Sequence, residues 1–331
     1  MSINKSKLII RKATKMDAAD IKLLAREVII ENYTTFLGEE NVKRFNESGM
    51  SDKEIDDNIN NMVVCEYEDE IIGICAFLDD LLHMLMVKHH YQGNGIGEII
   101  IEYVETEMFK ENTIIRLETF ENNIPAITFY KKNGWKIVGK EYSEHICKYI
   151  LKLEKINIDR LKIRQEQKDD YKQVYDVVKK SFENAEHTDN DEHNLVERLR
   201  NSKEFVPELS LVAELEGEIV GHILFTEIKI GEKIALALAP VSVIPKYQSR
   251  GIGSKLIIKG HEIAKSLGYE IVVVLGHEKY YPRFGYVKAS NYDIKAPFEV
   301  PDENFMVLEL KENALNEIEG VVEYSSEFFN A

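Results

Sequence analysis

The chain has 331 residues, which is long enough for two domains that each bury a hydrophobic core. With 44% hydrophobic residues, 30% charged residues and no apolar run near the ~20 residues of a membrane-spanning helix, the composition predicts a soluble protein that does not bind membranes. A formal net charge of −16 argues against a nucleic-acid partner and is compatible with a cationic amine. The first residues show no secretory signal, so we expect a cytoplasmic location, while the oligomeric state stays open.

The first half of the chain predicts a strand at Ile10 and Arg11, followed by a mixed series of helices and strands. The series is a helix, a hairpin, a strand, a helix and a strand, over residues 20–30, 62–78, 82–87, 98–109 and 113–119. The same order returns after Ile163 and Arg164, over residues 171–182, 209–225, 236–243, 254–267 and 270–275. We therefore expect two similar domains, residues 1–156 and 157–331. The second should end in a tail from Tyr292 with a closing strand over 305–310.

A glycine-rich phrase occurs once in each half, 156 positions apart. The two copies read Gln92-Gly93-Asn94-Gly95-Ile96-Gly97 and Gln248-Ser249-Arg250-Gly251-Ile252-Gly253. Each copy lies between a predicted strand and a predicted helix. Such a turn presents unpaired backbone N–H groups and the positive end of a helix dipole. Each half is therefore a candidate site for a phosphate or pyrophosphate group.

A second motif follows the last predicted strand of each half. It reads Phe129-Tyr130-Lys131-Lys132-Asn133-Gly134-Trp135 in the first half and Tyr280-Tyr281-Pro282-Arg283-Phe284-Gly285-Tyr286 in the second. Asn123 and Ala126 precede the first copy, whereas Leu275-Gly276-His277-Glu278-Lys279 stands in their place before the second. We expect Trp135 and Tyr286 to be core residues.

The order of these elements resembles that of the GNAT superfamily of acyl-CoA-dependent N-acyltransferases. It is a hairpin, a strand, the Q-x-x-G-x-G loop, a helix, a further strand and the N-x-x-A-x-x-F-Y-x-x-x-G-W motif. The resemblance covers nearly the whole chain in two copies, and the first half matches more fully. It implies an α/β (α+β) protein with two tandem GNAT folds, each a splayed, mixed, mostly antiparallel sheet flanked by helices. A dinucleotide-binding fingerprint would instead need G-x-G-x-x-G directly after the first strand of a βαβ unit.

The resemblance implies acetyl-CoA, or a related acyl-CoA, as co-substrate. Its pyrophosphate would lie on the two glycine-rich loops and on the residues that follow them, Glu98 and Ser254. The pantetheine arm would pair with the end of the preceding strand, where the sheet splays. These strand ends are Leu85-Met86-Val87 and Val241-Ser242-Val243, and Asn123 and Ala126 complete the expected contacts. The first loop has Asn94 where many relatives carry a cation, and the second has Arg250.

Acyl transfer to a primary amine needs a neutral nucleophile, a stabilised oxyanion and a proton for the departing thiolate. By resemblance, Tyr130 and Tyr281 would supply that proton, although either could instead be a core aromatic residue. The oxyanion would be met by a backbone N–H near Met86 or Ser242.

For the base in the first half we expect His83, two residues before Leu85 and on the same strand face, or Glu118 near the end of the next strand. The matching positions of the second half are Ala237 and Ala239, which cannot exchange protons. His277 is the candidate there, although it could also start a helix.

The cysteines Cys65, Cys75 and Cys147 form no C-x-x-C pair and no Cys/His ligand pattern, so we expect reduced core thiols and no metal.

The features together predict an N-acetyltransferase that acetylates a primary amine of a small molecule or peptide by direct attack, with the N-terminal domain catalytic. One alternative is that one or both domains bind CoA without catalysis. Another is a tandem acyltransferase of the mycothiol-synthase kind.

The acceptor would be selected by two variable loops, around residues 28–57 and 185–207. Their acidic residues suit a cationic amine, or are simply solvated charge. They are Glu39, Glu40, Asp56, Asp57, Asp189, Asp191 and Glu192.

Overall fold

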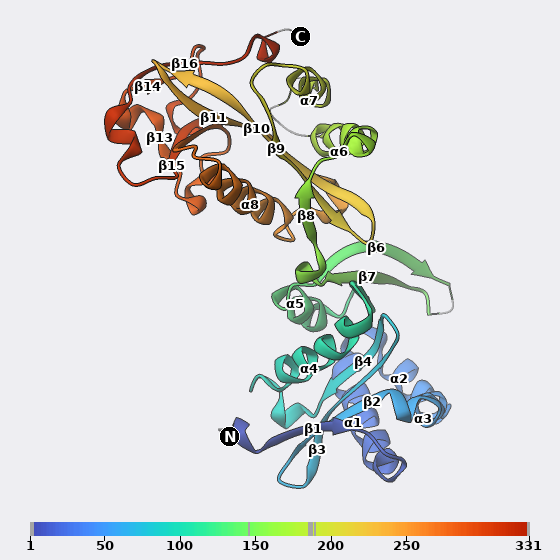
Figure 1. Cartoon of the computed structure of the whole chain (residues 1–331). Coiled ribbons are helices and arrows are strands. Elements are labelled where there is room, and N and C mark those ends of the chain that lie inside the picture. Colours follow the sequence, from blue (N-terminus) through green and yellow to red (C-terminus); the bar gives the residue numbers. More distant parts are fainter. Residues whose placement is uncertain (1–2, 145, 185–187, 189, 330–331) are drawn as a thin grey trace. The chain divides into compact units, whose positions relative to one another are not determined.

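The computed structural model describes residues 3–144, 146–184, 188 and 190–329. It divides into two compact units, Met1–Asn157 and Ile158–Ala331, which we call the N-terminal unit and the C-terminal unit (Figure 1). This division lies one residue from the predicted boundary. Asp189 and residues 185–187, from the second predicted acceptor loop, lie outside the described residues.

Within the described residues, seven strands form one sheet in the N-terminal unit, in the order β1-β2-β3-β4-β5-β7-β6. Neighbouring strands are antiparallel except for β4 and β5, which are parallel. The strands are β1 (Leu8–Lys12), β2 (Met62–Tyr67), β3 (Glu70–Leu78), β4 (Leu81–Val87), β5 (Ile114–Phe120), β6 (Lys136–Ser143) and β7 (Lys148–Ile156). The helices are α1 (Ala18–Leu37), α2 (Glu39–Glu47), α3 (Met50–Asn58), α4 (Ile96–Glu111) and α5 (Ile124–Lys132).

Two hydrophobic clusters cover the two faces of this sheet. α1, α2 and α3 bury Ile21, Val42 and Ile55 in one cluster, and α4 and α5 bury Ile100 and Tyr130 in the other. The predicted loop over 28–57 is therefore wrong. Single apolar residues such as Val42 and Ile55 anchor two short, mostly polar helices there, and this spacing is too sparse to be seen as a helical period.

The C-terminal unit repeats this plan with a larger sheet. Its main path is β13-β15-β12-β11-β10-β16-β14, and β9 joins β8 to β10 beside it. The strands are β8 (Lys162–Gln165), β9 (Phe205–Leu215), β10 (Glu218–Ile230), β11 (Lys233–Val243), β12 (Ile271–Leu275), β13 (Val287–Lys288), β14 (Ile294–Lys295), β15 (Phe305–Glu309) and β16 (Gly320–Glu323). The helices are α6 (Tyr171–Phe182), α7 (Glu192–Arg200) and α8 (Ile252–Ser266).

The predicted tail completes the C-terminal sheet. The predicted closing strand forms as β15 and pairs with β12, and β16 pairs with β10. Ile294, Leu315 and Val322 of the tail pack with residues of β10, β11 and β12 in one buried cluster. α6 and α7 pack against β9 and β10 in a second cluster. The tail therefore covers sheet area that would otherwise be exposed.

Both sheets open at the same place, as the resemblance implies. In the N-terminal unit, β5 pairs with β4 at Leu81 and Leu82, while β4 keeps β3 as its partner as far as Val87. In the C-terminal unit, β12 pairs with β11 as far as Leu238, while β11 continues to Val243. Among the described strands, none pairs with the remaining edge of β4 or β11. The predicted splay is confirmed.

The cysteines do not all behave as expected. Cys65 and Cys75 are buried, and burial raises the pKa of the Cys65 thiol to about 11. Cys147 is exposed in the turn before β7, so the expectation of a core thiol is wrong there.

Among the described residues, no helix is long and apolar enough to cross a membrane.

Candidate active site

The two glycine-rich loops are held by the same hydrogen bond. Gln92 Nε2 donates to Val87 O at 2.9 Å, and Gln248 Nε2 donates to Val243 O at 2.9 Å. The glutamine of each phrase therefore ties the loop to the last residue of the preceding strand. Gly95 has φ 81°, a left-handed conformation that favours glycine, and it caps α4.

Each loop leads directly into a helix N-terminus. The first hydrogen bonds within the helices run from Ile99 N to Gly95 O at 3.2 Å and from Lys255 N to Gly251 O at 3.0 Å. The backbone N–H groups of the residues between have no acceptor within the helix and point out of its end. Both loops therefore have the N–H arrangement that suits an anion.

The last glycine of each loop allows a helix to approach an aromatic ring. A Cβ on Gly97 would lie 3.2 Å from the Phe129 ring, and a Cβ on Gly253 would lie 2.9 Å from Tyr280 Oη. Phe129 and Tyr280 are equivalent residues of the second motif. The two motifs of each half are thus packed together.

The charges around the first loop nearly cancel. Asn94 Nδ2 donates to Tyr91 O and Gln92 O, so its side chain stabilises the loop itself. Glu98 pairs with Lys132 at 2.7 Å. A Cβ on Gly95 would lie 2.8 Å from Lys5 Nζ, which brings one ammonium from the N-terminal segment to the loop.

The second loop carries more positive charge. Ser254 stands at the position of Glu98, and Arg283, at the position of Lys132, donates to Ser254 Oγ at 2.7 Å. The Arg283 guanidinium also lies over the Tyr280 ring, 4.1 Å from its centroid. Arg250 adds a second guanidinium in the loop itself. Sequence reasoning missed Lys5, Lys132 and Arg283, although the alignment of Glu98–Lys132 with Ser254–Arg283 could have indicated the last two.

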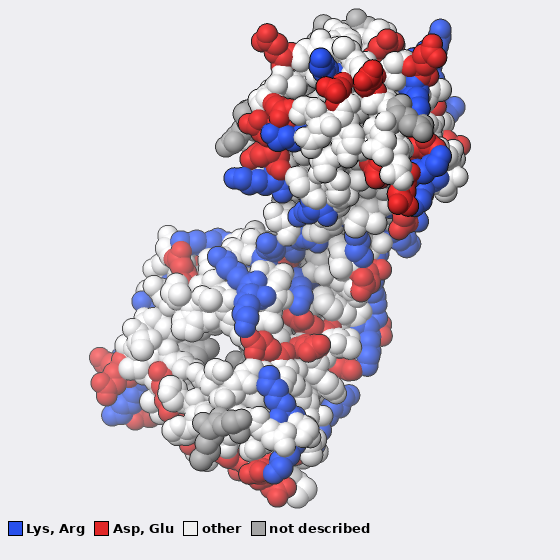
Figure 2. All heavy atoms as spheres, turned by 90° about the vertical axis from the view of Figure 1, so that its left-hand side faces the viewer, with Lys and Arg blue, Asp and Glu red and all other residues white. Residues whose placement is uncertain are grey.

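The surface of the protein also mixes acidic and basic side chains beyond the two loops. On the side shown in Figure 2, acidic and basic side chains are interspersed over both units. Among the described residues, no group of three or more His, Cys, Asp or Glu side chains could hold a metal ion. The net charge of −16 is thus not gathered into one acidic surface on this side.

The unpaired edge of β4 begins at a β-bulge. Phe77 pairs with Leu82 and Ala76 with Met84, which leaves His83 as the extra residue. The bulge reverses the alternation of side chains, so Leu82, rather than His83, shares its cluster with Leu85. The alternation on which the expected common face of His83 and Leu85 depends is therefore broken at His83. His83 is exposed at the start of the opening in the sheet.

β11 has the equivalent irregularity. Phe225 pairs with Leu238 and Ile223 with Val241, so Ala239 and Pro240 together oppose Leu224. The two bulges lie at the same point of the two sheets, beside the same splay. The edges that follow them are Leu85–Val87 and Val241–Val243, the segments predicted to pair with pantetheine.

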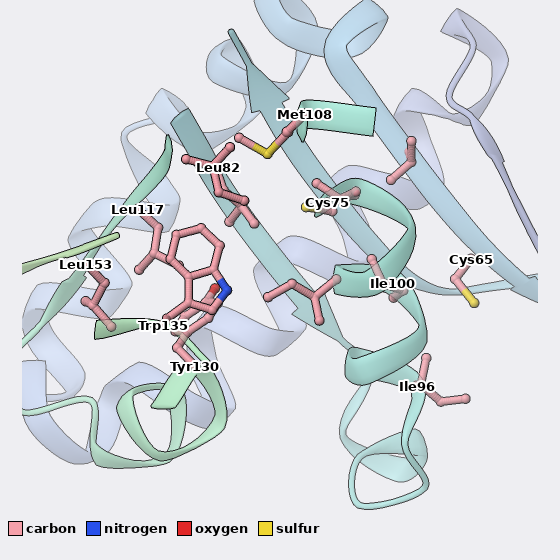
Figure 3. Packing of buried hydrophobic residues seen from close by; sticks show 14 of the residues in the cluster. Cys65, Cys75, Leu82, Ile96, Ile100, Met108, Leu117, Tyr130, Trp135 and Leu153 are labelled. Atoms are coloured by element: carbon pink, nitrogen blue, oxygen red, sulfur yellow. The ribbon is translucent and has the colours of Figure 1, made fainter. Parts of the chain in front are cut away.

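α5 positions Tyr130 in the N-terminal unit. Asn123 Oδ1 accepts from Ala126 N at 3.3 Å and caps the helix, so the Asn-x-x-Ala segment has a structural role of its own. Tyr130 is 7% exposed, and its ring lies 5.9 Å from that of Trp135 (Figure 3). Burial raises the pKa of Tyr130 far above its usual value, which keeps the phenol protonated. Trp135 is fully buried, as expected of a core residue, and donates to Glu105 Oε1 at 2.7 Å.

Glu118 lies on the face of β5 opposite α4, because its neighbour Leu117 belongs to the α4 cluster. It is exposed and lines a hollow of about 430 Å³ with Glu141, Glu144 and Lys152. Lys152 pairs with Glu141 at 2.6 Å, so this hollow has a net negative charge.

Tyr281 occupies the position of Tyr130 in the C-terminal unit. It is also 7% exposed, and burial raises its pKa far above the usual value. A Cβ on Gly276 would lie 2.2 Å from the Tyr281 ring, so any larger residue at this position would clash with the ring. His277 is exposed, and its Nδ1 accepts from Lys279 N at 3.2 Å, so its side chain stabilises the turn before Tyr281. Tyr286 is a core residue, as predicted.

Comparison with known proteins agrees with this geometry. A model of the acetyltransferase (GNAT) family matches residues 26–135 and again residues 171–286. The chain is 41% identical over 118 residues to the uncharacterized N-acetyltransferase YjhQ of Escherichia coli strain K12, a match that covers 34% of this chain and 65% of YjhQ, slightly under two thirds. It is 33% identical over 123 residues to the uncharacterized N-acetyltransferase YhbS of the same strain, covering 36% of this chain and 74% of YhbS.

Solved structures give similar relatives. YhbS from Escherichia coli in complex with CoA has 29% identity and a TM-score of 0.48, over 52% of this chain and 93% of that chain. A GNAT family acetyltransferase from Brucella melitensis in complex with acetyl-CoA has 32% identity and a TM-score of 0.43, over 51% and 97%.

The family model covers more than half of the chain, once in each unit. It confirms the resemblance, the tandem fold and the predicted class of enzyme, an acyltransferase of a family that uses acetyl-CoA. This chain, with two such domains in series, belongs to the acetyltransferase (GNAT) family.

Proposed function

We propose that the chain transfers the acetyl group of acetyl-CoA to a primary amine by direct attack, and that the N-terminal unit carries this reaction. The observation that supports it is the meeting of three parts in one unit. These are a helix N-terminus with free N–H groups, the unpaired edge of β4, and a buried phenol at Tyr130. Each part answers one need of a CoA thioester: its pyrophosphate, its pantetheine amides and its leaving sulfur.

The pyrophosphate would lie on the loop Gly93–Glu98, and the pantetheine would extend along Leu85–Val87. This path leads the thioester into the opening between β4 and β5. The amine nitrogen then forms a bond to the acyl carbon while the C–S bond breaks. Tyr130 Oη gives its proton to the departing sulfur, and a backbone N–H of the unpaired edge near Met86 meets the oxyanion.

The acceptor would approach from the face away from α4, because the CoA loop lies at the α4 end. An aromatic wall bounds that side, where the Tyr33 and Phe36 rings of α1 lie 6.1 and 5.7 Å from the Phe120 ring. Beyond it, Glu118, Glu141 and Glu144 give the hollow its negative charge. We propose a small-molecule or peptide amine that is cationic before it reacts, with Glu118 or His83 taking its proton.

The test is kinetic and uses the intact chain. Release of CoA thiol from acetyl-CoA is measured with a panel of amines, polyamines, aminoglycosides and amino acids. For the best acceptor, Tyr130→Phe should lower turnover by about 100-fold, whereas the matched Tyr281→Phe should change it little. Equal losses for the two variants would contradict the assignment to the N-terminal unit.

The second candidate function is binding of CoA without catalysis. Its support is Ala237 and Ala239, which leave β11 without an ionisable group where β4 has His83. Titration calorimetry of the intact chain with CoA separates the candidates. Two bound CoA molecules without turnover on any amine favour the binding role, and turnover favours the enzyme.

A further inference from the structure

Four buried positions differ in chemical kind between the two units. In the N-terminal unit all four are apolar and belong to the cluster beneath α1, and in the C-terminal unit all four are polar. The apolar residues are Ala13, Met62, Ile74 and Met86, and the polar residues are Glu166, Ser210, His222 and Ser242. A polar replacement in a core is costly unless its groups are paired, so four together need an explanation.

Backbone pairing makes these positions equivalent. Ala13 N donates to Met62 O at 2.9 Å, as Glu166 N donates to Ser210 O at 2.8 Å. Ile74 pairs with Met86 across β3 and β4. His222 pairs with Ser242 across β10 and β11 in the same register.

In the C-terminal unit these residues form a buried polar array. Arg200 donates from Nε and Nη2 to the two oxygens of Glu166, the first bond measuring 3.1 Å. Ser210 Oγ lies 2.6 Å from Glu166 Oε2 and 3.1 Å from His222 Nε2. The Arg200, Glu166 and His222 side chains are 4%, 1% and 0% exposed. The array is therefore closed to water at this end.

The hydrogen bonds fix the tautomer of His222. A carboxylate paired with arginine accepts hydrogen bonds, so the Ser210 hydroxyl donates to Glu166. Its lone pairs then accept from His222 Nε2–H, which leaves Nδ1 as an unprotonated acceptor. Among the described residues, neither His222 Nδ1 nor Ser242 Oγ has a hydrogen-bond partner, although both are buried.

The array ends at the opening in the sheet. Ser242 lies on β11 beyond Leu238, where β12 no longer pairs. A Cβ on Gly221 would meet Leu256 and Ile252 of α8 at 3.1 and 3.4 Å, so the next residue, His222, faces away from α8. Ser242, its direct partner, faces the same way. With CoA entering from the α8 end, an acceptor would have to approach on this face, which is the side that α6 covers.

We propose that the C-terminal unit is a second acyl-transfer site, in which Ser242 is a catalytic hydroxyl and His222, Ser210 and Glu166 are the residues that position it. The proposal rests on the proposed use of acyl-CoA and adds a second amine acceptor. In the proposed reaction the Ser242 hydroxyl would turn to donate to His222 Nδ1, the unpartnered acceptor on its cross-strand neighbour, and would so direct an oxygen lone pair toward the amine. Ala237 and Ala239 then need no acid–base role.

The protons balance as follows. As the amine nitrogen bonds to the acyl carbon, its proton passes to Ser242 Oγ while the serine proton passes to His222 Nδ1. The C–S bond breaks, and Tyr281 Oη gives its proton to the sulfur. When amide and thiol leave, Ser242 Oγ passes a proton to water that enters the emptied opening and takes one back from His222 Nδ1, and the phenolate regains a proton. Glu166, paired with Arg200 and bonded through Ser210, keeps the His222 ring and its tautomer in place.

The test uses the full chain with Tyr130→Phe, so that the N-terminal unit is silenced. Turnover of the same amine panel is measured with Ser242→Ala, Ser242→Thr and the control Thr226→Val added singly. Thr226 is a matched control, because its buried Oγ1 also lacks a partner and it pairs with Ala237, where β11 and β12 still pair. Ser242→Ala removes an unpartnered hydroxyl and should not unfold the protein.

We expect Ser242→Ala to lower turnover by about 100-fold, with a larger loss at lower pH, while CoA affinity is unchanged. Ser242→Thr should restore most of the rate, and Thr226→Val should have none of these effects. Full activity of Ser242→Ala, or no turnover of the Tyr130→Phe chain on any amine, would overturn the proposal. No turnover by the chain with both tyrosines intact would instead refute the proposed function.

Discussion

The two units have the same backbone plan but distribute charge and polarity differently around it. In the N-terminal unit, the helix start carries Glu98, paired with Lys132, and the core behind the sheet edge is apolar. In the C-terminal unit, Arg283 donates to the neutral Ser254 at the helix start, and the same core positions hold a hydrogen-bonded array. The backbone bonds that define a fold thus stay fixed while the side chains that decide its chemistry are exchanged in groups.

The largest expected difference between the units is their response to acid. Burial lowers the pKa of His222 to about 3 and that of His261 to about 4, whereas the described histidines of the N-terminal unit are exposed.

Both folded-state pKa values lie below the usual ~6.5, so the unfolded chain binds more protons than the folded chain. The free energy of unfolding therefore falls as the pH drops from about 6.5 toward 4. Each histidine should cost the C-terminal unit about 2 kcal/mol at pH 5.

Two signals separate the units in this acid titration. Trp135 is the chain's sole tryptophan, so its fluorescence reports the N-terminal unit, while far-ultraviolet circular dichroism reports both. Part of the dichroism should be lost at a higher pH than the fluorescence change. Coincident transitions would show that the buried histidines do not distinguish the units.

Moving one polar residue into the apolar core sharpens the comparison next. Ile74→His places an imidazole at the position of His222 without the Ser210 and Glu166 partners, so it should destabilise the N-terminal unit by about 3 kcal/mol. Urea unfolding followed by Trp135 fluorescence measures the loss. Ile74→Val is the control and should cost about 1 kcal/mol. A histidine variant as stable as the valine variant would mean that this core tolerates polarity unaided.

Exchanging the residues at the helix starts tests the charge difference at the loops. Ser254→Glu should weaken CoA binding to the C-terminal unit by roughly tenfold, because a carboxylate would pair with Arg283 and repel the pyrophosphate. Glu98→Ser should strengthen binding to the N-terminal unit by a similar factor. Titration calorimetry of the full chain, fitted to two sites, gives both constants. Changes of the same sign in the two variants would contradict this view of the loops.

The smallest expected effect concerns Lys5, the cation that the first loop receives from outside its own sequence. Lys5→Ala should weaken CoA binding to the N-terminal unit by about threefold, since an exposed charge near a helix terminus contributes little in salt. Lys7→Ala is the control, because Lys7 pairs with Glu68 at 2.7 Å on the surface. Similar losses of CoA affinity in both variants would mean that only the net charge of the unit matters, not the position of Lys5.

Local patterns predict much of this molecule and long-range ones do not. The duplicated loop, its helix and the hairpins follow from glycine placement and apolar periodicity, and α6 begins and ends where predicted. The bulge at His83 could not be predicted, because one extra residue in a strand leaves no mark on its composition but reverses its faces.

The buried array was missed for a related reason. The four residues lie on separate strands or next to one. Ser210, His222 and Ser242 are each a lone polar residue in an apolar segment, and Glu166 stands among other polar residues just after β8. Only the pairing register brings them together. Aligning the two halves residue by residue along that register would have revealed the four replacements, since each stands opposite an apolar residue of the other half.

The bond from Gln92 to Val87 O, and its copy from Gln248 to Val243 O, has a consequence for how tightly a ligand can bind. It fastens the anion loop to the strand edge before any ligand arrives, so the two ends of a long, flexible ligand meet a prearranged frame. Little conformational entropy of the protein is then lost on binding, and the ligand alone must become ordered. The entropic cost of binding then comes mainly from the ligand, and the same glutamine bond provides this in both halves of the chain.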